Sequence, residues 1–158
     1  MSMPQVPEYI GFGSYNASHV PVAVALTADA ADNKKPLFAH GLKELHLDIL
    51  YTPQAAQTTR FLEVFIKSLD EYGNVLSTKS TIVNGVSEID VFTNRQSGMP
   101  IVVPGEKSES AGNVIKADYD CDINAYTVEI SVRENDTGGT PAANFGSLFM
   151  KVRMFAKH

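Results

Sequence analysis

The chain has 158 residues, of which 44% are hydrophobic and 20% are charged. This length suits one domain with its own core, and the composition is too hydrophobic for a disordered chain of such modest net charge. With a formal charge of −5 and no basic cluster denser than Lys34-Lys35, binding to the phosphate backbone of a nucleic acid is disfavoured.

The cysteine content and the first ten residues indicate the cellular compartment of the protein. The single cysteine, Cys121, cannot form an internal disulfide, so stability has to come from packing. Residues 1–10 contain two prolines and Glu8 instead of a basic run followed by an apolar one, so we expect no secretory signal and synthesis in the cytoplasm. No apolar run approaches the roughly 18 residues of a membrane span, so we expect no membrane partner.

The first 18 residues mix proline, glycine, aromatic and polar side chains without a period, which predicts an extended arm or loop. Three aromatic side chains in this arm, Tyr9, Phe12 and Tyr15, need a surface to pack against. That surface belongs either to this domain or to a neighbouring subunit, because arms that dock on a neighbour are common in assemblies.

Alternation of apolar and polar residues after the arm predicts short strands separated by turns. The polar stretch around Gly73 and the Asn84-Gly85 pair are both typical of β-hairpin turns. Residues 52–56 favour one helical turn, and 93–112 are expected to form a surface loop with at most one short strand, over the apolar run 101–103. The expected strands cover residues 20–26, 44–51, 60–69, 75–83, 86–92, 115–123, 126–133 and 148–156.

About eight strands without a convincing long helix predict an all-β fold, either an antiparallel β-sandwich or a jelly-roll-like barrel. We expect a single domain over residues 1–158, with an arm over 1–18 and a β-sandwich body over 19–157. Alternate apolar residues give each strand one buried face. The expected inward residues include Leu45, Leu47, Ile49, Tyr51, Tyr126, Val128, Ile130, Val132, Leu148, Met150, Val152 and Met154.

One run of carboxylates resembles a calcium-binding loop in its ligand positions. The matching residues are Asp118, Asp120, Asp122, Asn124 and Glu129. The position that needs glycine for the sharp turn holds Ile123, and both flanks alternate as strands instead of helices. The pattern therefore favours a solvated strand face, and no metal ligand is assigned. Carboxylates spaced about 7 Å apart along a strand leave open a cation shared with a loop or neighbouring subunit.

The histidines and the cysteine of the sequence do not form a recognisable metal site or catalytic site. The four histidines, His19, His40, His46 and His158, have no spacing that would place two of them on one metal. His46 and Asp48 share a strand face, which permits an acid–base pair, but two polar residues on a wet face are usually only solvated. Cys121 falls on the apolar side of its strand, as expected for an unreactive structural thiol. We therefore expect no catalytic residue, no cofactor and no enzymatic activity.

A β domain without such motifs is typical of a structural or interaction protein. In overall character the chain resembles the virion accessory proteins of tailed bacteriophages, of the capsid decoration or cement type. The features behind this resemblance are the non-periodic arm 1–18, the β-rich body 20–156 and the long loop 93–112. An outer position suits an arm with no Lys or Arg, since shell proteins that package RNA usually carry a basic arm.

The resemblance implies a homo-oligomer, with a trimer favoured, that binds a major capsid protein, stabilises the shell and resides in the virion. A phage tail or neck component is the alternative compatible with it. A second class also stays open: a ligand-binding β-sandwich module for calcium or carbohydrate, built on the acidic face of Asp118, Asp120 and Asp122 and on the loop 135–139.

Overall fold

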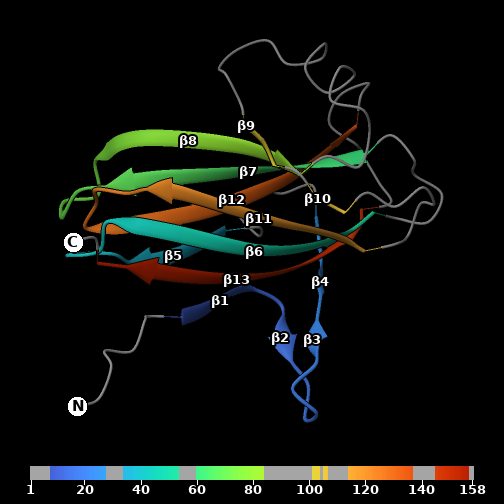
Figure 1. Ribbon diagram of the computed structural model, residues 1–158. Helices are drawn as coiled ribbons and strands as arrows, with labels where there is room; N and C mark the ends of the chain where they lie inside the picture. The colour runs from blue at the N-terminus through green and yellow to red at the C-terminus, as the bar shows by residue number, and fades with distance from the viewer. Residues whose placement is uncertain are drawn as a thin grey trace.

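The computed structural model describes residues 8–27, 34–53, 60–83, 101–103, 105–106, 114–136 and 145–156. Two β-sheets pack face to face (Figure 1), which confirms the expected all-β sandwich. Each sheet ends in edge strands, so the described strands do not close into a barrel. No helix among the described residues is long and apolar enough to span a membrane.

The first sheet has six strands in the order β1-β13-β6-β11-β10, with β4 also paired to β13. All of its pairs are antiparallel. Its strands are β1 (Glu8–Phe12), β4 (Val24–Ala25), β6 (Glu44–Thr52), β10 (Gly105–Glu106), β11 (Ile115–Asp122) and β13 (Ser147–Phe155).

The second sheet has five strands in the order β5-β12-β7-β8-β9, all antiparallel except the parallel pair β8 and β9. The predicted hairpin of β7 and β8 is confirmed, and its turn is closed by the Asp70 carboxylate, which accepts the backbone N–H of Tyr72 and of Asn74 at 2.9 and 2.8 Å. Its strands are β5 (Lys34–Phe38), β7 (Arg60–Leu69), β8 (Val75–Val83), β9 (Ile101–Val103) and β12 (Thr127–Asp136).

The core lies between the two sheets and follows the alternation in the sequence. Alternate residues of β6 and β13 are fully buried and meet the inward residues of β7 and β12. Burial of this many aliphatic side chains is the main stabilising contribution to the fold. The confirmed inward residues are Leu45, Leu47, Ile49, Tyr51, Val128, Ile130, Val132, Leu148, Met150, Val152 and Met154.

The N-terminal region corrects two predictions. Residues 8–12 are not an irregular arm but the edge strand β1, which pairs with β13. The single strand expected over 20–26 is divided into β3 (Pro21–Val22) and β4. β3 pairs with β2 (Ser14–Tyr15) in a small hairpin that projects away from the sandwich (Figure 1). The physical reason is that β1 and β4 occupy successive parts of the β13 edge, so the chain between them leaves the sheet.

The aromatic residues of the expected arm pack on this domain. Phe12 is buried in the core, and Tyr9 is half-buried against it. Tyr15 is half-buried and meets Phe149 of β13 edge to face, with ring centroids 5.2 Å apart.

Two smaller predictions differ from the structure, and three lie outside the described residues. The region 93–112 contains two short strands instead of at most one, because β9 extends the five-stranded sheet and β10 the six-stranded sheet. Tyr126 was expected to point inward but is 39% exposed, since it lies in the turn before β12. The helical turn after Pro53, the Asn84-Gly85 turn and the strand 86–92 fall outside the described residues.

Candidate functional site

Large apolar side chains that are exposed to solvent gather in two places on the described part of the chain. One group lies on the projecting hairpin, defined here as residues 13–22, and on β4 at its base. The other lies at one end of the sandwich. Clustered apolar exposure is a mark of interaction surfaces, whereas single exposed residues need no explanation. The hairpin group is Val20, Val22 and Val24, and the end group is Phe38, Tyr72, Val75, Leu76 and Tyr126; Val114 lies apart from both.

The projecting hairpin leaves the sheet at Gly13. This glycine has a φ of 91°, a conformation that side chains other than glycine rarely adopt. A Cβ atom at this position would lie 2.5 Å from the carbonyl oxygen of Val22 and 2.9 Å from the ring of Phe149. Glycine is therefore required both by the bend and by the close approach of the two hairpin strands.

The tip of the hairpin is held by its own hydrogen bonds. The Asn16 side-chain oxygen accepts the backbone N–H of Ser18 at 2.9 Å and of Val20 at 3.0 Å. His19 takes a φ of 59°, and its ring stacks on Tyr15 with centroids 4.2 Å apart and planes 12° from parallel. Because Tyr15 also meets Phe149, the hairpin has a defined shape and is attached to the body.

The surface of the hairpin is uncharged. No Asp, Glu, Lys or Arg occurs between Glu8 and Asp29, although one residue in five of the whole chain is charged. Val20, Val22 and Val24 are 51%, 44% and 43% exposed, and they occupy alternate positions. The sequence predicted their shared face but not its exposure, and the signal that was missed is this absence of charge.

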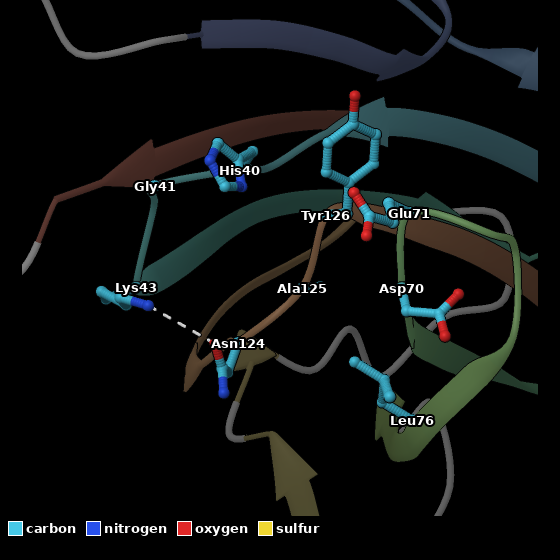
Figure 2. Close-up of a pocket in the computed structure, with 9 residues that line it drawn as sticks. All are labelled: His40, Gly41, Lys43, Asp70, Glu71, Leu76, Asn124, Ala125 and Tyr126. Carbon is cyan, nitrogen blue, oxygen red and sulfur yellow. Dashed lines mark hydrogen bonds between the residues drawn. The ribbon is translucent and has the colours of Figure 1, made fainter.

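The second apolar surface surrounds an open groove of about 410 Å³ at the end of the sandwich, shown in Figure 2. The groove lies between the turns that precede β6, β8 and β12. Tyr126 packs edge to face on Phe38 at 5.2 Å and lies 5.5 Å from the His40 ring. The lining residues are His40, Gly41, Lys43, Asp70, Glu71, Leu76, Asn124, Ala125 and Tyr126.

Polar groups at the groove are partly engaged with each other. The Lys43 ammonium donates to the side-chain oxygen of Asn124 at 3.4 Å. The Asp70 carboxylate closes its own turn and also accepts the Asn74 side-chain amide at 3.0 Å. The hydrogen bonds of Asp70 hold its pKa below the ordinary value, with the Asn74 backbone making the largest contribution. Glu71 in this groove is exposed to solvent.

The predicted polar face of His46 and Asp48 forms a charged cluster on the outer side of the six-stranded sheet. The register of β6 and β11 places Asp120 opposite His46 and Asp118 opposite Asp48. The structure thus brings two of the three predicted carboxylates to the histidine. Asp122 lies opposite Glu44 instead.

Both ring nitrogens of His46 meet carboxylates. Nε2 lies 3.0 Å from Oδ1 of Asp48, and Nδ1 contacts Asp120. Burial opposes the charged ring, but these hydrogen bonds outweigh it and raise the pKa of His46 above its ordinary value. Burial also opposes ionisation of Asp48, yet the bond to His46 lowers its pKa. The pKa of Asp118 is raised, chiefly by its contact with Asp48.

This cluster is an ion-pair network and not an assigned metal centre. His46, Asp48 and Asp118 each offer a ligand atom, and these atoms lie within 4.8 Å of one another. However, Arg153 of β13 already binds Asp48, with Nη2 3.2 Å from Oδ2, and the remaining His46 nitrogen is bound to Asp120. A metal would have to displace these partners, so the residues carry no metal assignment.

Cys121 is half-buried and free. Burial, with smaller contributions from neighbouring carboxylates, raises the pKa of its thiol to about 11. The thiol is therefore protonated near neutral pH, and the thiolate is the reactive form.

The comparisons with known proteins assign no family. No protein-family model matches the chain. No curated protein matches it either. Among solved structures, it is similar to the VP2 subviral particle of infectious bursal disease virus, with a TM-score of 0.48 and 11% identity. The match covers 96% of this chain but 33% of that one, so the chain spans about a third of its structural neighbour. A likeness at this level places no function on the chain.

Proposed function

We propose that this chain is a non-enzymatic structural protein that associates with further copies of itself through the projecting hairpin. The observation that carries the proposal is the apolar surface of Val20 and Val22 on a hairpin that stands away from the body, continued by Val24 of β4 at its base. Interface cores are depleted in charged residues, whereas an ordinary solvated surface contains them. Removal of these side chains from water is the expected driving force for association.

The β5 edge of the second sheet supports this choice of surface. The edge strand β5 carries Lys34, Lys35 and Pro36, and such residues discourage pairing with another chain. Association through that edge is therefore disfavoured. The hairpin has the opposite character, since its turn is closed and its large exposed side chains, Val20 and Val22, are apolar.

Within this proposal, the finer assignment is a virion component of the capsid decoration or cement type. The chain would then form a homo-oligomer, with a trimer favoured, and bind a major capsid protein in the virion. This part rests on the resemblance of the sequence to small virion proteins of tailed phages. A phage tail or neck component could use the same hairpin surface, but it would bind a different partner.

Light scattering of the purified chain tests the association. The wild type is expected to be oligomeric, and the variant V20S/V22S/V24S is expected to be monomeric with an unchanged circular dichroism spectrum. The matched control is V75S/L76S, which removes exposed apolar side chains at the far end of the sandwich and should leave the oligomer intact. A monomeric wild type, or a triple variant that remains oligomeric, would contradict the proposal.

A ligand-binding module is the second candidate, because the groove of Figure 2 combines exposed aromatic rings with polar side chains. Aromatic rings flanked by hydrogen-bonding groups suit a carbohydrate. Titration with simple sugars, followed by the NMR signals of Tyr126 and Asn124, would show saturable shifts that Tyr126→Ala abolishes. NMR signals that stay unchanged at high sugar concentration would count against carbohydrate binding. A melting temperature that does not change when calcium is added would count against a calcium site.

A further inference from the structure

We infer that His46 is a pH-sensitive link that joins β6 to β11 on the outer face of the six-stranded sheet and weakens as the pH rises. This inference is independent of the proposed assembly and concerns the stability of the sheet. It starts from the position of one imidazole between two carboxylates, one on its own strand and one on the neighbouring strand.

The geometry selects the doubly protonated ring. Nδ1 faces Asp120, and Nε2 faces Asp48 at 3.0 Å. An imidazolium donates from both nitrogens, whereas a neutral imidazole has one donor and one lone pair. Loss of the proton therefore leaves a lone pair facing a carboxylate oxygen, whichever tautomer forms.

The charges around the ring come from every strand packed beside it. β11 supplies the opposing carboxylates, and β13 supplies two cations. Arg153 lies opposite His46 and binds Asp48, so one of the two carboxylates keeps a cationic partner when the histidine is neutral. Among the contacts of this cluster, Asp120 has no cationic partner besides His46. It therefore loses the most electrostatic stabilisation when the histidine becomes neutral. The charged groups on this face, among the described side chains, are Glu8, Glu44, Asp48, Lys116, Asp118, Asp120, Asp122, Lys151 and Arg153.

The network extends beyond the histidine to the edge of the sheet. The Lys151 ammonium lies 4.0 Å from Asp48 and 3.7 Å from Glu8 on β1. The connected side chains thus cross β11, β6, β13 and β1, and β1 leads directly into the projecting hairpin.

The direction of the effect follows from the raised pKa of His46, which burial opposes and the two carboxylates produce. A group with a higher pKa in the folded than in the unfolded chain contributes its full stabilisation below the unfolded value, here 6.5. That contribution is lost as the pH rises through the folded value. We therefore expect the melting temperature to fall from about neutral pH upward because this link is lost.

Two measurements test the link. NMR titration of the His46 ring should give a pKa above 6.5 in the wild type and a lower one in Asp120→Asn. In melting experiments from about pH 5 to about pH 9, His46→Gln should remove the wild-type decline above neutral pH. His40→Gln, at the groove and away from this cluster, is the matched control and should keep the wild-type profile.

Either of two results would overturn the inference: a His46 that titrates at or below 6.5, or an Asp120→Asn chain whose His46 titrates as in the wild type. The titration needs only the wild type and Asp120→Asn, so it decides the question even if His46→Gln folds poorly. A monomeric chain that still shows the raised His46 titration would refute the proposed assembly and leave this link intact.

Discussion

The Tyr51 hydroxyl of β6 donates to the Glu134 carboxylate of β12 and so joins the two sheets through the core. Both residues are buried, and Glu134 also accepts the backbone N–H of Gly146 at 2.8 Å. Burial and the neighbouring carboxylate raise the pKa of Tyr51, so its hydroxyl is a neutral donor at neutral pH. Arg60, with Nη1 3.7 Å from Glu134, balances the buried charge.

Tyr51→Phe should lower the free energy of unfolding by about 1–3 kcal/mol, because a buried carboxylate oxygen loses its donor. Urea denaturation monitored by circular dichroism measures the change. The matched control is Tyr72→Phe, which removes the same hydroxyl from a side chain that is 82% exposed and should change stability by less than about 0.5 kcal/mol. Equal losses in the two variants would show that the hydroxyl of Tyr51 contributes nothing specific.

Gly13→Ala should destabilise the root of the projecting hairpin more than Gly41→Ala destabilises its turn. Both glycines have positive φ, 91° and 84°, so each substitution incurs about 1–2 kcal/mol of backbone strain. Only at Gly13 does the added Cβ also meet the backbone of Val22. Limited proteolysis should cut the Gly13→Ala chain faster within 14–22, and unfolding in urea should give the larger loss. Equal losses in the two variants would argue against the close approach.

Asn16→Ala should loosen the hairpin tip without unfolding the sandwich. The substitution removes the oxygen that accepts the N–H groups of Ser18 and Val20. Global stability should change by less than about 0.5 kcal/mol, because the site is exposed. Hydrogen exchange at the two amides should accelerate, while Asn124→Ala, an exposed control, should leave it unchanged. Unchanged exchange in Asn16→Ala would mean that the turn is held by its backbone alone.

Alternation in the sequence was sufficient to predict the central strands. β6, β11 and β13 each place apolar residues at every second position, and the structure buries those faces. It was insufficient for the N-terminal region, because a period of two shows which residues share a face but not whether another element covers it. Val20, Val22 and Val24 have the same pattern as buried residues, yet no described element covers them.

Prediction of the charged cluster around His46 from the sequence meets the same limit. The sequence placed His46 and Asp48 on one face because they are two residues apart. It could not place Asp120 beside them, since that contact joins residues 74 positions apart and depends on the pairing register of β6 and β11. A shift of one residue in that register would turn Asp120 to the core face and remove the contact.

Cys121 should react slowly with thiol reagents in the folded chain. Its pKa of about 11, against an ordinary 9.0, is raised mainly by burial, and the thiolate is the reactive form. Two pH units correspond to about a 100-fold smaller thiolate fraction near pH 8. A thiolate of higher pKa is also more nucleophilic, so the reaction with an aromatic disulfide reagent should be slower than in urea by about 10-fold or more. The rate in the folded chain should keep rising with pH up to about 11. Equal rates in the folded and unfolded chains would mean that the thiol is exposed and its pKa ordinary.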